Sequence, residues 1–499
     1  MAQAEQKEQA AQAAEQAAEE GSLLQQIIDQ GIRPKDEEQR TYAKDLIGEL
    51  VAQIMAQEMT LSKDTEASIK HHIAQIDARI SKQLNEVMHA SEFQKLEASW
   101  RGLHYMVHQS ETGEMLKIRV MNVSKKDLLK DMEKAVEFDQ AAIFKKIYEE
   151  EYGQFGGFPY GALIGDYEFG GDPQDITLLE KMSNVAAAAH APFIAAAHPA
   201  LFNLESFTNI GVPRDLAKIF DNRKEAKYVK WRSFRDSEDS RYVGLALPHV
   251  LMREPYGKET VPVEAFDFEE EVDGKAHNKY LWGNAAYALA ARLTDAFARY
   301  NWCAAIRGVE GGGLVEGLPT HSFRTDEGEV ALKCPTEIAI TDRREKELSD
   351  LGFIPLIHCK GTDYAAFFGA QSANRPRKYD TDAANANARL SAQLQYILAT
   401  SRFAHYLKAM MRDKIGKFMT RQNCQDFLNR WIANYVLLDD SASQEAKAQK
   451  PLREARIDVT EDASKPGVYK AIAFLKPHFQ LDELTVSLRL VAELPAPAK

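Results

Sequence analysis

Hydrophobic residues recur at helical spacing in the first quarter of the chain. Apolar positions every three to four residues predict three helices, at 42–54, 69–87 and 93–107. The second of these stripes alternates steps of four and three, which is typical of a helix that faces another helix. Its candidate interface residues are Ile69, Ile73, Ile76, Ile80 and Leu84. Such a stripe usually packs into the chain's own core, and a helix of a second chain is the alternative.

The middle of the chain alternates strand and helix patterns. Residues 115–122 alternate apolar and polar positions at period two, and Ser124 with Asp127 then forms a variant capping box at a helix start. Buried strands are predicted where short apolar runs are bounded by Gly, Pro and Asp, at 160–166, 192–197 and 242–248. A helix is predicted at 173–189. The expected fold class is α/β (mixed α+β), with a central sheet covered by helices.

These patterns divide the chain into three regions. Residues 1–60 are expected to form a mobile Ala/Gln/Glu-rich arm and a first helix. Residues 61–380 are expected to form a central α/β domain that includes the remaining N-terminal helices. Residues 381–499 are expected to form a C-terminal domain of helices, a polar linker at 439–467 and a β-hairpin at 468–494.

The C-terminal hairpin is the strongest assembly signal in the pattern. An isolated two-stranded hairpin is marginal in water, and its two edges offer unpaired backbone groups. Either the hairpin joins the chain's own sheet or strands of other subunits complete it, and the polar tether favours other subunits. The residues predicted to pair between subunits are Val468, Tyr469, Ala471, Ile472, Phe474, Leu484, Val486, Leu488, Leu490 and Val491.

Composition and charge exclude several functions. The chain has 499 residues, too many for one ordinary core, and it is 45% hydrophobic and 27% charged, which is typical of folded proteins. Its formal charge of −12 argues against binding nucleic acid or an anionic membrane. The start has neither the basic region nor the apolar run of a signal peptide, and no apolar stretch is long enough to insert into a membrane. The expected location is the cytoplasm, because the four cysteines lack disulfide or metal spacing.

Little in the sequence points to catalysis. The glycine-rich segment Gly308–Gly317 contains neither a P-loop nor a GxGxxG pattern, so a tight connection is expected, with a nucleotide-binding enzyme as the alternative. The charged segment 341–348 offers Arg343, Arg344 and Glu347 as interface charges, or simply a helix start with pairs four residues apart. No catalytic residue, metal site or cofactor is expected.

Long motifs across the chain carry a family resemblance. They include LEASWRGLHYMV (96–107), FGGFPYGALIGDYEF (155–169), SRYVGLALPHVLMREPYG (240–257), NWCAAIRGVEGGGLVEGLP (301–319) and FLKPHFQLDELTVSLRLVAELP (474–495). With these motifs the chain resembles the large subunit of the type VI secretion contractile sheath. The resemblance covers nearly everything except the N-terminal arm, and the sheath of another phage-tail-like contractile apparatus is the alternative.

The resemblance implies partners that spacing alone does not indicate. Such subunits pair with a small sheath subunit, and the heterodimers stack with other copies into a helical sheath around an inner tube protein. The sheath sits on a baseplate and contracts to expel the tube, and an AAA+ unfoldase then disassembles it, mostly through the small subunit. In this family the C-terminal strands form a sheet with strands of small subunits. The resemblance implies no enzymatic activity.

Overall fold

The computed structural model describes residues 36–55, 65–213, 215–222, 225–325, 327–415, 417, 420–461 and 469–480. The chain forms two compact units. The first contains the chain up to Leu84 together with residues 263–269, and the second contains Asn85–Pro262 and the chain from Glu270 onward. The boundary that the sequence predicts near residue 380 lies inside the second unit.

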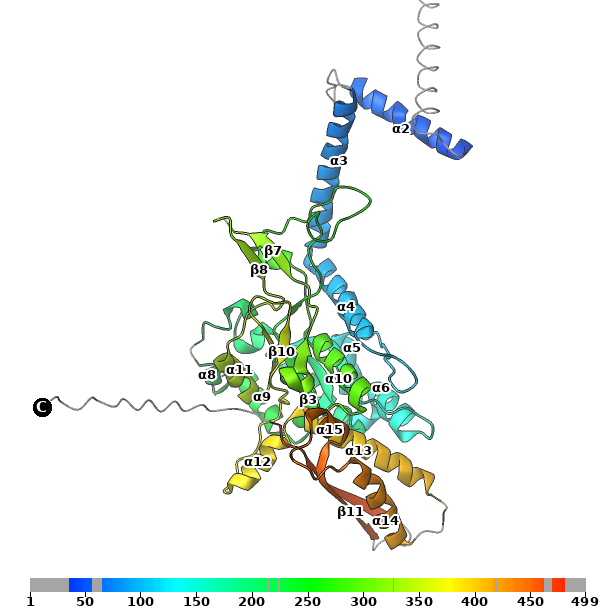
Figure 1. Ribbon diagram of the computed structural model, residues 1–499, viewed down its shortest axis with the longest axis vertical. Coiled ribbons are helices and arrows are strands. Elements are labelled where there is room, and N and C mark those ends of the chain that lie inside the picture. Colours follow the sequence, from blue (N-terminus) through cyan, green and yellow to red (C-terminus); the bar gives the residue numbers. More distant parts are fainter. Residues whose placement is uncertain are drawn as a thin grey trace, which may run out of the picture. The chain divides into compact units, whose positions relative to one another are not determined.

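Figure 1 shows the helices and strands of the described residues. The helices are α2 (Glu37–Met55), α3 (Thr65–Met88), α4 (Ser91–His108), α5 (Lys125–Lys134), α6 (Ala142–Phe144), α7 (Pro173–Ala189), α8 (Ala217–Phe220), α9 (Ala226–Asp236), α10 (Ala286–Tyr300), α11 (Asp342–Asp350), α12 (Asp382–Leu390), α13 (Leu394–Asp413), α14 (Arg421–Ile432) and α15 (Gln444–Gln449). Tighter or wider turns are η2 (Phe138–Gln140), η3 (Lys145–Gly153), η4 (Pro199–Phe202), η5 (Phe207–Asn209), η6 (Asp239–Tyr242), η7 (His277–Lys279), η8 (Val309–Gly313) and η9 (Ala433–Tyr435). The strands are β1 (Leu163–Phe169), β2 (Phe193–Ala197), β3 (Val243–Leu247), β4 (Val250–Leu251), β5 (Trp282–Gly283), β6 (Leu314–Val315), β7 (His321–Arg324), β8 (Val330–Lys333), β9 (Ile354–His358), β10 (Ala365–Phe367), β11 (Leu452–Glu461) and β12 (Tyr469–Pro477).

A six-stranded sheet forms the centre of the second unit, in the order β1-β2-β3-β9-β10-β6. The first four strands of this order run parallel, and β10 and β6 pair antiparallel at one edge. The three strands predicted from apolar runs are confirmed as β1, β2 and β3. Parallel strands need crossover connections, and helices such as α7, which begins and ends as predicted, supply them.

Both faces of the sheet are buried. Along β3, Val243, Leu245 and Leu247 face one hydrophobic core, which also contains residues of α5, α7 and α9. The alternate residue Ala246 faces a second core, formed with residues of α10 and the first turns of α13. This alternation follows from the period of two in a strand, and burial on both faces explains why the strands are continuous apolar runs.

Two sequence predictions differ from the structure. Residues 115–122 form no strand ladder, although their burial alternates at 116–119. The apolar run from Leu281 to Tyr300 also predicts a helix, but α10 begins only at Ala286, where the backbone N–H of Ala286 donates to Oδ1 of Asn284 at 2.8 Å. By contrast the Ser124 cap is confirmed, since its hydroxyl oxygen accepts from the backbone N–H of Asp127 at 3.1 Å.

The C-terminal region differs most from expectation. The segment 439–467 is not simply a linker, because it contains α15 and the ten-residue strand β11. The polar Ala/Ser/Gln composition of 439–450 suits a short capped helix as well as a tether, and Ser443 caps α15 through the backbone N–H of Ala446. A third hydrophobic core joins the later turns of α13, α14, β11 and β12 (Figure 1).

The glycine-rich turn η8 depends on close backbone contacts. The backbone N–H of Gly308 donates to the carbonyl of Phe367 on β10 at 2.7 Å, and the N–H of Gly313 donates to Gly308 at 2.8 Å. A Cβ added to Gly313 would lie 2.5 Å from the Phe367 carbonyl oxygen and 2.7 Å from the Cα of Arg307. A Cβ on Gly311 would meet nothing within 4 Å.

We predict that Gly313→Ala destabilises the second unit by about 1–3 kcal/mol, because backbone atoms cannot move aside as a flexible side chain can. Thermal unfolding should show a lower melting temperature. Gly311→Ala is the matched control and should stay within about 0.5 kcal/mol of the parent. Equal melting temperatures for the two variants would contradict the close packing of this turn.

Candidate assembly interface

The β11–β12 ribbon contains the described part of the predicted C-terminal pairing element. The two strands are antiparallel, with Ile457 opposite Ala473 and Val459 opposite Ala471. One face of the ribbon packs into the third core through Ile457 and Val459 of β11 and residues of β12 such as Leu475. The other face is exposed.

Side chains of α14 close the outer edge of β11. The amide of Asn429 donates to the carbonyl of Ile457 at 2.7 Å and accepts from the N–H of Ile457 at 2.9 Å. The side-chain oxygen of Gln425, one helical turn earlier, accepts from the N–H of Val459 at 3.1 Å. These two amides therefore bond the edge as a neighbouring strand would.

The same contacts determine which groups β12 presents on its other side. The backbone groups of Ile457 and Val459 point toward α14, so their opposite residues, Ala473 and Ala471, belong to pairs without mutual hydrogen bonds. The N–H and C=O groups of Ala471 and Ala473 therefore point to the free edge of β12, where no described strand pairs. The edge has the donors and acceptors for an added strand.

The predicted pairing residues divide into two sets. Tyr469, Ala471, Ile472 and Phe474 all lie on β12, with Ile472 and Phe474 about half exposed on the outer face (51% and 52%). Within the described residues the partner of β12 is β11, not the second predicted strand. The residues outside the described part of the chain are Val468, Leu484, Val486, Leu488, Leu490 and Val491. Sequence reasoning missed Gln425 and Asn429, although two amides four residues apart beside an apolar helix face were the available signal.

A cluster of polar contacts fixes the chain just after β12. The side chain of Gln480 accepts a hydrogen bond from Arg307 Nε at 2.9 Å and donates to the carbonyl of Ala304 at 3.2 Å. The hydroxyl of Tyr396 donates to the carbonyl of His478 at 3.2 Å and accepts from the N–H of Gln480, also at 3.2 Å. The last described residues are therefore attached to the body of the second unit through α13 and the segment before η8.

The stripe on α3 is exposed and belongs to none of the hydrophobic cores that the described residues form. Ile69, Ile73, Ile76 and Ile80 are each exposed, and Leu84 is half-buried. An exposed row of four isoleucines is unusual on a monomeric surface, which favours the alternative of a second chain. The identity of that chain stays a prediction.

The charged residues of α11 serve mainly inside the chain. Arg344 pairs with Glu347 at 2.6 Å and also donates to the carbonyl of Pro213 at 2.6 Å. Arg343 lies 3.3 Å from Glu347, as the helical spacing predicts, and its side chain is 79% exposed. Of the three predicted interface charges, Arg343 is therefore the best placed to meet another molecule.

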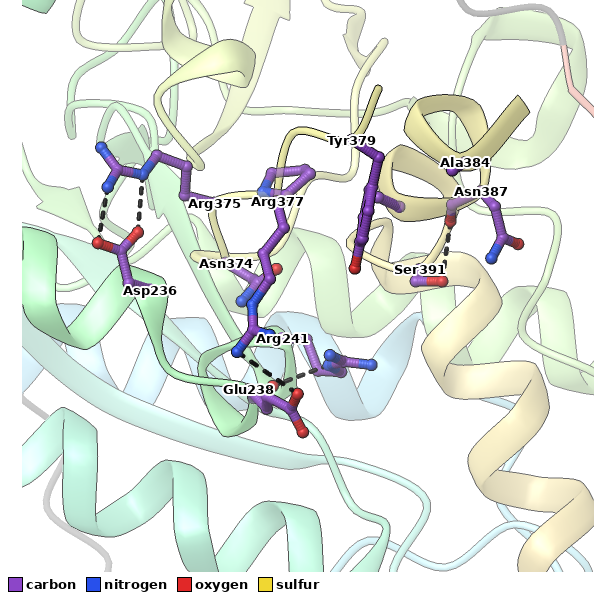
Figure 2. A pocket seen from close by; sticks show the side chains of 12 residues that line it. Asp236, Glu238, Arg241, Asn374, Arg375, Arg377, Tyr379, Ala384, Asn387 and Ser391 are labelled. Atoms are coloured by element: carbon purple, nitrogen blue, oxygen red, sulfur yellow. Dashed lines mark hydrogen bonds and ion pairs between the residues drawn. The ribbon is translucent and has the colours of Figure 1, made fainter. Parts of the chain in front are cut away.

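A surface pocket of about 250 Å³ lies between η6 and the start of α12. Figure 2 shows its arginines directed toward acidic neighbours. Arg375 holds Asp236 through two hydrogen bonds of 2.7 and 2.6 Å, and Arg377 lies 3.7 Å from Glu238. Asn374 donates to the carbonyl of Ser237 at 2.8 Å. The charges of this pocket are used in holding its own walls together, and its lining contains no pairing of a nucleophile with a base.

The glycine-rich turn leaves little room for a ligand, because Gly312 and Gly313 pack directly on the backbone of Ala305 and Phe367. Among the residues that the structure describes, no cluster of three or more His, Cys, Asp and Glu side chains is arranged to hold a metal ion. None of the helices in the described ranges is long and apolar enough to cross a membrane.

An imidazole held between two carboxylates joins three segments at the carboxyl end of the sheet. His249, in the turn after β3, contacts Glu337 through Nδ1 and Glu168 of β1 through Nε2, the latter at 3.0 Å. Glu337 also accepts a hydrogen bond from the hydroxyl of Ser206 at 2.8 Å and lies 3.3 Å from His277 Nε2. We refer to His249, Glu168 and Glu337 as the histidine clamp.

The carboxylates keep the clamp histidine charged. Burial by itself lowers the pKa of His249, but the hydrogen bonds and charges of Glu168 and Glu337 outweigh burial and raise that pKa to about 10. Burial raises the pKa of Glu337, but the bonds from His249 and His277 outweigh it and hold the pKa below its usual range. The pKa of Glu168 is likewise lowered, because its bond with His249 outweighs burial. A charged imidazole that donates from both nitrogens explains this arrangement without a metal or a reaction.

Comparison with known proteins gives these surfaces a context. Residues 70–374 match the family described as EvpB/VC_A0108, tail sheath N-terminal domain, and residues 383–494 match the tail sheath gpW/gp25-like domain of the same description. The type VI secretion system sheath protein TssC1 of Pseudomonas aeruginosa is 51% identical over 485 residues, which are 97% of this chain and 96% of that protein.

Two solved structures give weaker matches. The baseplate of the anti-feeding prophage has a TM-score of 0.36 at 9% identity, covering 76% of this chain and 83% of its own. The contracted sheath complex of an extracellular contractile injection system has a TM-score of 0.33 at 9% identity, covering 62% and 68%.

Both family matches describe tail sheath domains, and together they span most of the chain, so its class is that of contractile tail sheath proteins. With half of its residues shared with a type VI sheath protein over almost the full length of both, the chain belongs to the type VI secretion system sheath protein family. The resemblance carried by the sequence motifs is thereby confirmed at the level of the family.

We predict that the histidine clamp makes stability depend on pH in a defined direction. Because the folded-state pKa of His249 is raised from 6.5 to about 10, its stabilisation is complete below about pH 6.5 and is lost as the pH rises toward 10. The lowered pKa values of Glu168 and Glu337 act in the opposite sense, with stabilisation complete above about pH 4.5 and lost in acid.

Melting temperatures of the parent and His249→Gln measured from pH 5 to 10 test this dependence. The difference between the two should be largest near pH 5–6 and should shrink as the solution becomes alkaline. His104→Gln, at an exposed position on α4, is the control and should follow the parent at every pH. A difference for His249→Gln that stays constant over the whole range would contradict a charged His249.

Proposed function

We propose that this chain is the large structural subunit of a type VI secretion contractile sheath. It forms a heterodimer with the small sheath subunit, and the heterodimers polymerise helically around an inner tube and contract to expel it. The remaining partners follow from this role: the tube protein, a baseplate, and an AAA+ unfoldase that acts on the contracted sheath mostly through the small subunit. The assembly acts in the bacterial cytoplasm.

The observation that carries the proposal is the 51% identity to a type VI sheath protein along nearly the whole of both chains. The free edge of β12 supports it independently, since a subunit that must join others needs a surface of this kind. A heterologous contact whose rotation does not close produces a helical filament, which is the architecture that a sheath requires. The same full-length identity favours the type VI system over another phage-tail-like contractile apparatus.

Strand pairing suits subunits that must remain attached while they move. Each backbone hydrogen bond added at the β12 edge contributes only about 0.5–1.5 kcal/mol. A row of such bonds, with contacts between the exposed Ile472 and Phe474 and side chains of the added strand, gives a stable contact between subunits. The contact at Gln480 fixes where the following chain leaves the body of the subunit. The rigid second unit can then rotate without losing its neighbours.

The proposed role requires no bond chemistry from this chain. The arginine pocket and the histidine clamp are both explained as internal ion pairs, and the glycine turn is packed on backbone. We therefore propose that the protein is not an enzyme and uses no cofactor.

We predict that Ala471→Pro prevents sheath assembly with little effect on the fold of the subunit. Proline removes the N–H that Ala471 directs to the free edge of β12, and the Ala471 side chain is exposed. Electron microscopy of the chain co-expressed with its small sheath subunit should show tubules for the parent and few or none for the variant.

Ala471→Val, which keeps the N–H and adds strand propensity, is the matched control and should form tubules. Circular dichroism of each variant alone verifies the fold. Tubules at parental numbers with Ala471→Pro would show that this edge is not used.

A further inference from the structure

Residues 117–122 form an extended segment whose backbone has no partner. Among the described residues, no N–H or C=O group of this segment takes part in a hydrogen bond. The segment lies between two fixed points: the carbonyl of Leu116 accepts from the N–H of Gly113 at 2.9 Å, and the carbonyl of Val123 accepts from the hydroxyl of Tyr167 at 2.7 Å. Six such residues span about 20 Å, the length of an ordinary strand.

The side chains at 116–119 alternate in burial as in a strand that has one covered face, whereas residues 120–122 are all exposed. Ile118 packs against a small core with Met106 and Tyr287, between the exposed residues Lys117 and Arg119. Val120 is 69% exposed and Met121 is 49% exposed. The period-two alternation in the sequence therefore matches the burial of the side chains only at 116–119, and the segment forms no ladder with a described strand.

The chain's own sheet does not supply that ladder. Strand β1 lies at one edge of the six-stranded sheet. The carbonyl oxygens of Gly165 and Tyr167 on β1 lie 3.3 and 3.4 Å from the side-chain nitrogen of Asn284. Asn284 thus occupies groups that a neighbouring strand would need. The exposed backbone groups of 117–122 are open to water, which an added strand can replace.

We propose that residues 117–122 pair with a β-strand of the small sheath subunit, and that this strand is acidic. The proposal rests on the proposed function and adds a second point of strand pairing, separate from the β12 edge. It identifies the surface through which the heterodimer forms.

Charge selects the kind of partner. Residues 115–126 contain Lys117, Arg119, Lys125 and Lys126 and no acidic residue. Arg119 and Lys125 pair with Glu151 and Asp175 of this chain. Lys117 lies over the ring of Phe158, 3.7 Å from its centroid, whereas Lys126 forms no ion pair among the described residues. Two copies of this segment placed side by side would bring like charges together, which destabilises a ladder, so a strand with acidic residues is favoured over a second copy.

Single prolines at Val120 and Met121 test the proposal. Successive residues of a strand direct their N–H groups to opposite edges, so one of the two prolines must face any added strand. Both side chains are exposed and neither N–H is bonded by a described residue, so both variants should melt close to the parent. At least one of Val120→Pro and Met121→Pro should reduce co-purification of the small sheath subunit by about tenfold or more, while Val120→Ala and Met121→Ala retain it.

Hydrogen exchange of the full chain, alone and in the heterodimer, gives the second measurement. Amides of 117–122 should exchange rapidly in the free chain and at least about tenfold more slowly in the heterodimer. Unchanged exchange and normal co-purification of both prolines would overturn the inference while leaving the proposed function intact. Protection that appears in the chain alone as its concentration increases would also overturn it, because the occupant would be a second copy. Failure of the parent chain to bind the small subunit at all would instead refute the proposed function.

Discussion

Strand edges must have their backbone groups bonded, and this requirement organises the whole second unit. The parallel strands satisfy each other, with Asn284 on carbonyls of β1 and the amides of α14 on the edge of β11. Where a side chain bonds an edge, growth of the sheet stops there. Where none does, as at β12, at residues 117–122 and at the outer edges of the β7–β8 pair, the described chain has backbone donors and acceptors to offer. The same rule therefore determines what is finished within the subunit and what is left for assembly.

The sequence predicts well those elements whose pattern is decided locally. Helix α7 and the strands β1–β3 match their apolar runs, because burial on both faces leaves a clear signal. The pattern at 115–122 matches the burial of the side chains at 116–119 but does not produce a strand, since alternation reports which side chains are covered and not which backbone is adjacent. Strand β11 was predicted as part of a polar linker for a related reason. Its outer face carries Glu454, Arg456 and Asp458, and these charged residues hide the apolar positions of the strand.

The candidate site was predictable only in part. Residues of β12 were identified from a short run that is apolar on both faces, but the direction of its free edge follows from Asn429 and Gln425, which bond β11 from a helix about 30 residues earlier in sequence. No local pattern contains that information. The histidine clamp was also beyond sequence reasoning, because Glu168, His249 and Glu337 are separated by more than 80 residues each and meet only where the parallel strands end at the same edge.

The β12 edge and the segment 117–122 differ in charge, and this difference bears on how an assembly avoids mispairing. The exposed face of the β11–β12 ribbon mixes signs, with Glu454 paired to Lys476 at 2.9 Å and Arg456 over the ring of Phe474 at 4.8 Å. The segment 115–126 is purely basic. Backbone pairing alone cannot distinguish one strand from another, since every strand carries the same donors and acceptors. Discrimination must therefore come from side chains. A partner strand rich in acidic residues makes favourable charge interactions with the basic segment that it cannot make with the mixed charges of the ribbon. Two edges with different charge patterns can accept two different strands, so that subunits joined at several points still assemble in one order.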